Sequence, residues 1–306
     1  MAKIINYFEC PVEVGTTEDG NKLKKGIVGG TLTRVSAKLV DDEGNEEYVE
    51  VDTEDEHGYD VLDGLEALIL EFYDPVNGDD YNNRSVWINK SKNKKKGDPL
   101  GNVLDTKPKI GYCYAIRGNW SPETEEYEER FWAKGIRSVG NRINFLNSEQ
   151  TETQMVQGIF PIWHKESTTV GRRVYAATNT IAINAPLAND GGNWGAAFVN
   201  ISNDILAANG LTPEDLARDA DGACKRAVIT FIGDTLDVKV DKNDNVKKMS
   251  IKKDGTVYIE ILAASEEAEI PEASTGENTE AATAATGTDG FVPIPDDLAD
   301  DELPFN

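Results

Sequence analysis

The chain has 306 residues, of which 39% are hydrophobic, so it can bury one large core or two ordinary ones. It contains no run of about 18 apolar residues, which excludes an ordinary membrane-spanning helix, and its first residues lack the pattern of a secretory signal. Three widely spaced cysteines, Cys10, Cys113 and Cys224, predict reduced thiols rather than a disulfide framework. We therefore expect a cytoplasmic protein.

From the N-terminus onward, the sequence predicts mainly strands. Residues 31–40 and 46–51 alternate on either side of Gly44-Asn45, a pattern typical of a β-hairpin. Residues 62–74 are apolar enough for a helix or a buried strand, and their periodicity does not decide between the two.

The middle and the end of the chain continue this pattern. Residues 110–118 and 130–136 are rich in aromatic and β-branched side chains at strand length. Residues 226–245 contain two strand candidates, and residues 246–262 alternate on both sides of an Asp-Gly pair, which predicts a second hairpin.

Helix signals are few. Residues 201–210 have the pattern of a short helix closed by Gly210, and a second helix is predicted after Thr212 as N-cap with Pro213 at its first position. The sequence therefore predicts a mainly β fold with two or three short helices.

Charge is distributed unevenly along the chain, whose net charge is −24. The first eighty residues hold 21 acids against six bases, whereas residues 84–142 hold thirteen bases against seven acids. The basic part is interleaved with aromatic side chains. Cations along the phosphates and flat rings for base stacking are the two requirements of single-strand nucleic-acid binding. The alternative is that the rings fill a β core and the lysines decorate its outside.

We assign the predicted nucleic-acid surface to thirteen residues of this basic part. They are Arg84, Trp87, Lys90, Lys92, Lys94, Lys95, Lys96, Arg117, Trp120, Arg130, Trp132, Lys134 and Arg137. A similar mixture recurs later, at Trp163, Lys165, Arg172, Arg173 and Tyr175.

Motifs of catalysis are absent from the sequence. There are two histidines, no Cys-x-x-Cys pair, no phosphate-binding loop and no nucleophile elbow. The acids Asp52, Glu54, Asp55 and Glu56 could hold Mg²⁺, but hard-cation sites need inward-facing oxygens, and a solvated loop is the preferred interpretation. We expect no enzyme activity, no catalytic residue, no metal and no cofactor.

The composition changes after Ala264. Residues 265–306 hold twelve acids and no Lys or Arg, and residues 265–295 are too poor in apolar side chains to fold alone, which predicts a disordered linker. The last eleven residues, 296–306, read DDLADDELPFN, an acidic string that ends in an apolar group.

This ending resembles the acidic tip of bacterial and bacteriophage single-stranded-DNA-binding proteins. The matching positions are Asp296, Asp297, Asp300, Asp301, Glu302, Leu303, Pro304 and Phe305. The order of β-rich body, linker and acidic tip is also similar. One position departs from the family, because Asn306 follows Phe305, whereas the family's phenylalanine carries the terminal carboxylate.

The resemblance implies an OB-fold core in residues 1–264, as one elaborated barrel or as two packed barrels with a division near residues 150–160. It also implies that the tip binds replication or repair proteins, with an acidic rim formed by Asp300, Asp301 and Glu302 around an apolar hook formed by Leu303, Pro304 and Phe305.

The function that we expect is non-catalytic binding of single-stranded DNA in phage-type replication, recombination and repair, in the host cytoplasm if a phage encodes the protein. Two alternatives remain open. One is a structural or scaffolding phage protein, and the other is an acidic inhibitor that mimics DNA. Oligomeric state, and preference for DNA over RNA, do not follow from the sequence.

Overall fold

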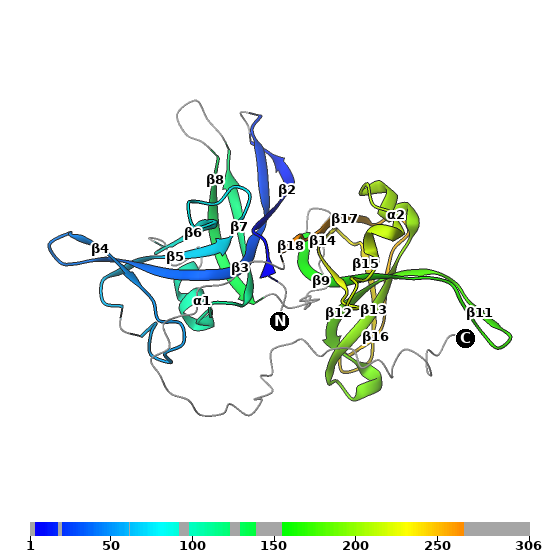
Figure 1. The fold of residues 1–306 in the computed structure, drawn as a ribbon. Coiled ribbons are helices and arrows are strands. Elements are labelled where there is room, and N and C mark those ends of the chain that lie inside the picture. The colour runs from blue at the N-terminus through cyan, green and yellow to red at the C-terminus, as the bar shows by residue number, and fades with distance from the viewer. Residues whose placement is uncertain are drawn as a thin grey trace.

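The structure, a computed structural model, describes residues 4–17, 20–60, 62–91, 98–122, 129–138 and 155–265. Strands dominate these residues and the helices are short, so the prediction of a mainly β fold is confirmed. Figure 1 shows two lobes, one formed by the chain before the gap at 139–154 and one formed by the chain after it. Within the described ranges, no helix combines the length and the apolar character needed to cross a membrane.

The first lobe is built on an antiparallel sheet with β3 at its centre. The path through the sheet is β6-β5-β3-β7-β8, and β2 and β4 pair with β3 off this path. The strands are β2 (Phe8–Thr16), β3 (Lys22–Val40), β4 (Glu46–Glu50), β5 (Leu65–Tyr73), β6 (Asn83–Asn89), β7 (Cys113–Ser121) and β8 (Arg130–Ser138).

The central strand β3 changes partners along its length. Its first half pairs with β2 and β7, and its second half pairs with β4 and β5. Gly29 lies near this change, where a Cβ atom would stand 2.1 Å from the carbonyl oxygen of Tyr114. Glycine therefore permits two backbones to approach closely near the point where β3 changes its pairing partners.

A short helix, α1 (Pro99–Thr106), connects β6 to β7 and packs against β6 and β8. The carboxylate of Asp98 caps it by accepting from the amide of Gly101, and Leu100 and Val103 are buried. The side-chain oxygen of Asn102 accepts a hydrogen bond of 2.8 Å from the backbone amide of Ile136 in β8. The helix thus covers the space between β6 and β8, the two outer strands of the path.

The second lobe repeats this plan. Its sheet follows the path β13-β12-β9-β14-β17. These strands are β9 (Met155–Lys165), β12 (Thr178–Pro186), β13 (Trp194–Ile201), β14 (Lys225–Ile232) and β17 (Thr256–Ile261). The helix α2 (Asn203–Ala208) and the 3₁₀ turn η3 (Pro213–Leu216) lie between β13 and β14, and the hairpin of β15 (Leu236–Val240) and β16 (Val246–Ile251) lies between β14 and β17. Smaller elements are β1 (Ile4–Ile5), β10 (Thr168–Val170), β11 (Arg173–Tyr175), η2 (Ala188–Asp190) and β18 (Ala264–Ser265).

An asparagine next to α2 plays the same part as Asn102. The side-chain oxygen of Asn209 accepts from the amide of Ile259 at 2.8 Å, and its amide group donates to the carbonyl of Val257 at 2.9 Å. Both asparagines therefore tie the helical connection of their lobe to the backbone of the last strand of the sheet. The hydrogen-bond plan, and not only the strand order, recurs in the two lobes.

Both lobes have the connectivity of the OB fold. In each sheet the first strand of the path in chain order is central, the second and third strands lie on one side of it, the fourth and fifth lie on the other, and a helix joins the third to the fourth. Of the two arrangements left open by the sequence, the described residues contain two OB-type sheets rather than one elaborated sheet.

Several sequence predictions are confirmed. Residues 31–51 form the β3–β4 hairpin, and residues 110–118 and 130–136 lie in β7 and β8. For residues 62–74, which the sequence left open between helix and strand, the structure shows the strand β5. The predicted helix at 201–210 is α2, whereas the one after Thr212 is a single 3₁₀ turn with a capping box. The sequence analysis missed α1, although Asp98 followed by Pro99 is a helix-start signal.

The predicted hairpin at residues 246–262 is wrong. The strands β16 and β17 are present, but β16 pairs with β15 and β17 pairs with β14. The hydroxyl group of Thr235 accepts from the amide of Thr256, and the amide of Lys252 donates to the carbonyl of Thr235. These bonds hold both sides of the turn against the β14–β15 connection, so the strands diverge instead of pairing with each other.

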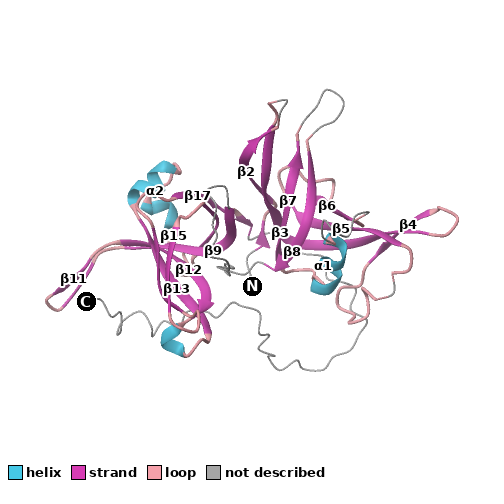
Figure 2. Ribbon diagram, turned by 180° about the vertical axis from the view of Figure 1, so that it is seen from behind, coloured by secondary structure: helices cyan, strands magenta, loops and turns pink. Residues whose placement is uncertain are grey.

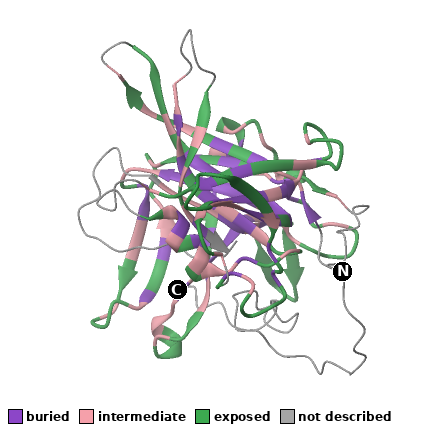
Figure 3. Cartoon of the chain, turned by 90° about the vertical axis from the view of Figure 1, so that its left-hand side faces the viewer, coloured by how far each residue is buried: buried purple, intermediate pink, exposed green. Residues whose placement is uncertain are grey.

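Each sheet buries one face in its own core, and a third apolar cluster joins the lobes. Phe160, Ile181 and Phe231 lie in the second core, and Leu32, Leu70 and Ile116 lie in the first. The joining cluster consists of Ile5, Phe8, Cys10, Ile27, Ile159, Val228 and Leu262. Strand β1 also pairs with β18, which brings the beginning of the described chain to its end (Figure 1). Figure 2 shows the same two lobes from behind, and Figure 3 shows buried residues along the strands of the body.

The asparagine clamp of the second lobe can be tested by mutation. Replacing Asn209 with Ala removes three hydrogen bonds and leaves the amide of Ile259 without its acceptor, which should lower the free energy of unfolding by about 1–3 kcal/mol. Urea unfolding followed by circular dichroism measures this change. The exposed Asn243→Ala is the control and should stay within about 0.5 kcal/mol. Equal stability of both variants would contradict the clamp.

Candidate nucleic-acid interface

The outer face of β7 and β8 brings together four of the predicted binding residues. Along β7 the buried residues Tyr114, Ile116 and Trp120 alternate with residues that point away from the core. Arg117 is one of these outward residues, and Arg130, Trp132 and Lys134 are exposed on the neighbouring strand β8. The strand alternation therefore collects three cations and an indole ring on one surface.

A β-bulge shapes this surface. The pairing of β7 with β8 shifts between Arg117, opposite Gly135, and Gly118, opposite Ala133. Lys134 is the extra residue, so it faces outward with Trp132 while Ile136 returns to the core. Bulges often redirect side chains in this way near functional sites.

The same face continues onto β3 and β2. Trp132 lies opposite Asn119, Asn119 lies opposite Lys25, and Lys25 lies opposite Val12. Lys25 is exposed, and the sequence analysis did not include it among the binding residues. Lys25 was missed because it lies far from residues 84–142 in the sequence. Only the pairing of β3 with β7 brings it beside Asn119 and Trp132. We call Lys25, Arg117, Arg130, Trp132 and Lys134 the cationic face.

The cations of this face form no ion pair with an acid in the part of the chain that the structure describes. In the described ranges, Lys25, Arg117, Arg130 and Lys134 belong to no ion pair, although other residues form such pairs, among them Lys24 with Glu129. Trp132 is 51% exposed. The face thus offers positive charge and an accessible ring, which are the two features that a single-stranded nucleic acid uses.

Trp120 corrects the sequence-based assignment. Its side chain is only 6% exposed and packs edge-on against Phe131, with ring centroids 4.7 Å apart. Gly118 leaves the room for this pair, because a Cβ atom there would lie 2.4 Å from the ring of Phe131. Trp120 is therefore a core residue and cannot stack on bases. It directly follows Asn119, the strand partner of Trp132, so the alternation of the strand turns it inward.

Trp87 and Lys90 lie on a different surface, the outer side of β5 and β6. Trp87 is 42% exposed and stands edge-on to Tyr48 of β4 at a centroid distance of 6.4 Å. Charge here is balanced, because Lys90 pairs with Glu66 and Lys38 pairs with Glu46. This surface offers rings for stacking but little net positive charge.

Arg84, a residue of β6, contacts Tyr7 and Glu9 near the beginning of the described chain. Its guanidinium lies over the ring of Tyr7, 5.6 Å from the centroid, and 3.8 Å from the carboxylate of Glu9. Burial, reinforced by the hydrogen bond to Glu9, raises the pKa of the Tyr7 hydroxyl. Arg84 is thus engaged with protein groups, whereas the cations of the cationic face form no ion pair among the described residues.

The structure describes few of the remaining residues that the sequence analysis singled out. Lys92, Lys94, Lys95 and Lys96 lie outside the described residues, as do the linker 265–295, of which only Ser265 is described, and the tip 296–306. Arg137 belongs to β8, opposite Ala115, and its side chain is outside the description.

The second lobe carries aromatic residues that the sequence analysis only partly found. On its outer face, Phe198 of β13 packs edge-on against Trp163 of β9 with centroids 5.9 Å apart, and Arg218 lies over Trp163 at 5.9 Å. Trp194 and Phe198 are both half-exposed on the same side of β13. Their spacing of four along a strand was the available signal.

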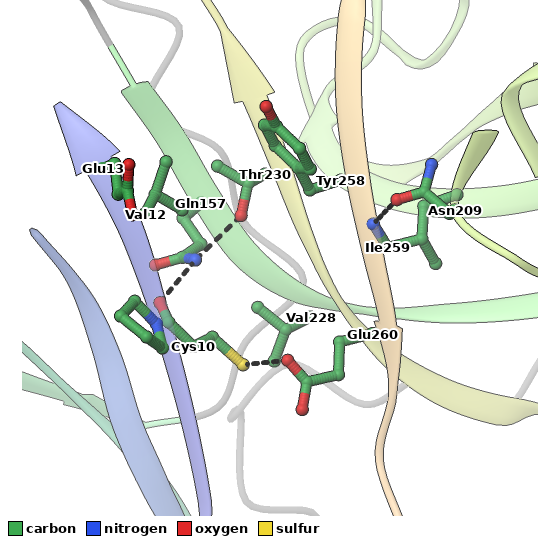
Figure 4. A pocket seen from close by; sticks show the side chains of 11 residues that line it. Cys10, Val12, Glu13, Gln157, Asn209, Val228, Thr230, Tyr258, Ile259 and Glu260 are labelled. Carbon is green, nitrogen blue, oxygen red and sulfur yellow. Dashed lines mark hydrogen bonds between the residues drawn. The ribbon is translucent and has the colours of Figure 1, made fainter. Parts of the chain in front are cut away.

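A cavity of about 430 Å³ lies where the lobes meet, lined by β2, β9, β14 and β17 (Figure 4). The Gln157 amide group donates to the Cys10 carbonyl and to the Thr230 hydroxyl, at 3.3 and 2.8 Å. The thiol of Cys10 donates to the carboxylate of Glu260 at 3.0 Å. Burial, together with the negative charge of Glu260, raises the pKa of Cys10, so this thiol stays protonated and is a structural group rather than a nucleophile.

The acids at residues 52–56 form a turn. One oxygen of Asp52 accepts from the amides of Glu54 and Asp55. Throughout the described part of the chain, no group of three or more His, Cys, Asp or Glu side chains is arranged to hold a metal ion.

No protein-family model and no curated protein sequence matches this chain. Among solved structures, a deletion mutant of the single-stranded DNA binding protein from Thermus aquaticus matches over 88% of this chain and 95% of its own, at 10% sequence identity and a TM-score of 0.18. The two backbones do not superpose closely at that score, so this match carries no argument about function.

The different positions of Trp120 and Trp132 give a direct test. Replacing Trp120 with Ala empties part of the core and should cost about 3–5 kcal/mol of unfolding free energy. Trp132→Ala removes an exposed ring and should change it by no more than about 0.5 kcal/mol. Urea unfolding monitored by circular dichroism distinguishes the two. A large loss for Trp132→Ala would show that its ring supports the fold and is not free to bind.

Proposed function

We propose that this protein binds single-stranded DNA without catalysing a reaction, and that the cationic face is its principal contact. The observation that carries the proposal is the combination found on β3, β7 and β8. Four exposed cations without ion-pair partners in the described ranges surround the exposed ring of Trp132, on an OB-type sheet. OB folds are a recurrent scaffold for oligonucleotide binding.

The chemistry of this face suits a single strand. The cations Lys25, Arg117, Arg130 and Lys134 would neutralise successive phosphates, and the ring of Trp132 would stack on a base, which contributes about 1–3 kcal/mol per base. Phosphate contact and stacking are both independent of base identity, so we expect little sequence preference. The net charge of −24 does not exclude this, because 21 acids lie in the first eighty residues and twelve in residues 265–306, although five acids in residues 123–129 directly precede Arg130.

The finer parts of the proposal rest on sequence. The C-terminal residues Asp300 to Phe305 resemble a partner-binding tip, in which acids guide the encounter with a basic rim and Phe305 fills an apolar pocket. Through this tip the protein would recruit replication, recombination or repair proteins. A phage-type protein working in the host cytoplasm fits the layout of body, linker and tip.

A binding titration tests the cationic face. Trp132→Ala should weaken binding to poly-dT by about 1–3 kcal/mol in free energy while the protein remains folded. Arg117→Glu with Lys134→Glu should weaken binding further. For each phosphate that is no longer neutralised, the fall in the logarithm of the binding constant per tenfold rise in salt should become smaller by about 0.7. Fluorescence anisotropy with a labelled oligonucleotide at several salt concentrations measures both effects.

The matched control is Lys239→Glu with Lys248→Glu on the β15–β16 hairpin. This pair makes the same change in net charge on two exposed lysines that face each other across two strands. Its affinity should stay near that of the unchanged protein. If the control loses as much as the cationic-face variant, the effect is one of overall charge, and absence of any binding would favour a scaffolding or DNA-mimic role.

Two truncations test the tail. Deleting residues 265–306 removes twelve acids and should tighten DNA binding at low salt, because these acids compete with phosphates for the cationic face. Deleting only residues 303–306 keeps the acids, so DNA affinity should be unchanged while capture of replication proteins in a pull-down disappears. Weaker DNA binding after the long deletion would refute the competition.

A further inference from the structure

Two hairpins project from opposite ends of the molecule. The first consists of the end of β3 with β4, residues 36–50, and we call it the acidic arm. The second consists of β10 and β11 with their flanks, residues 165–177, and we call it the basic arm. Figures 1 and 2, which view the molecule from opposite sides, both place the tips of β4 and β11 at the two far ends of the molecule.

The two arms carry opposite charge. Between Asp41 and Glu50 the acidic arm has six acids and no base. Glu46 and Glu50 pair with Lys38 and Arg34, but Asp42, Glu43 and Glu47 belong to no ion pair in the described ranges. The acids near the tip therefore keep their charge available for another molecule.

The basic arm has three bases, Lys165, Arg172 and Arg173, and a single acid, Glu166. All of them are exposed, and none of the three bases forms an ion pair with a described residue. The two arms are thus complementary in charge, although they lie too far apart in one molecule to meet.

The basic arm also exposes apolar side chains. Val170 is 64% exposed and Val174 is 73% exposed, on a two-stranded ribbon with no third strand beside it in the described structure. On the acidic arm, Tyr48 is 54% exposed. Next to the cations, Val170 and Val174 suit contact with a protein surface, whereas Tyr175, which is 45% exposed, is a ring of the kind that can stack on a base.

From this geometry we propose that the basic arm of one molecule binds the acidic arm of a second copy of the same chain. Because the two arms differ, the contact is head-to-tail, and it leaves one free arm at each end of the pair. Repeated contacts of this kind build an open row of molecules rather than a closed ring, unless the rotation between neighbours happens to close it. The proposal does not depend on nucleic-acid binding.

The contact should be weak between free molecules. Two hairpin tips offer less than the roughly 1,200 Å² of buried area that is typical of stable complexes. Copies held side by side on one extended ligand would meet at a much higher effective concentration, so the same contact would then favour adjacent occupancy.

Sedimentation velocity of the full chain tests the proposal without any ligand. The sedimentation coefficient of the unchanged protein should rise with concentration, and this rise should shrink between about 0.05 M and about 0.5 M salt as the charges are screened. Arg172→Glu with Arg173→Glu, or Asp42→Lys with Glu43→Lys, should weaken the association constant by roughly tenfold or more, because like charges then face each other.

The decisive step is to mix the two variants. Each alone carries arms of like charge, but the mixture pairs the reversed basic arm of one variant with the reversed acidic arm of the other. The unchanged acidic arm of the first variant also matches the unchanged basic arm of the second, so association should return and the two variants should alternate along the row. The variant Lys239→Glu with Lys248→Glu controls for net charge and should associate like the unchanged protein.

Four results would overturn the proposal. The unchanged protein could stay monomeric at low salt and high concentration, or the mixture could fail to restore association. The variant with Asp42→Lys and Glu43→Lys could associate normally, which would assign the basic arm to other acids such as those of residues 265–306. Finally, Arg172→Glu with Arg173→Glu could weaken poly-dT binding and leave self-association unchanged, which would make the basic arm a nucleic-acid contact.

Discussion

A β-strand presents successive side chains to opposite faces, and each of the two sheets buries only one of its faces in its own core. This constraint separates the residues that hold the protein together from those that can meet a ligand. On β7 it turns Trp120 into the core and Arg117 outward, and on β8 it turns Phe131 inward and Trp132 outward. The bulge at Lys134 then returns Ile136 to the core without disturbing the outward face.

The N-terminal segment makes the two lobes into one body. Phe8 and Cys10 of β2 pack with Ile159 and Val228 of the second lobe, and β1 pairs with β18 near the end of the described chain. The outer face of β2, β3 and β7 is therefore covered at one end by the second lobe and open at the other, where the cationic face lies. The same sheet face therefore packs against the second lobe at one end and carries the cationic face at the other, so the apolar contact limits the extent of the proposed interface.

Charge is divided in space as well as in sequence. On the outer side of β5 and β6, Lys38 and Lys90 are paired with acids, whereas the cations of the cationic face form no ion pair in the described ranges. The acidic and basic arms hold opposite charge at the two ends of the molecule. A protein of net charge −24 can therefore still present positive surface where it is useful, because surface charges act over distances of about 8–10 Å at physiological salt.

Local pattern in the sequence determined the strands, the β3–β4 hairpin and the short helix at 201–210, because alternation, turn residues and caps act within a few positions. It also determined that cations and rings share the segment 84–142. Tertiary structure alone decided that β16 and β17 join different partners, that Trp120 is core while Trp132 is exposed, and that Lys25 lies across two strand pairings from Trp132. These outcomes depend on strand register and on contacts between residues far apart in the chain, and no short stretch of sequence contains that information.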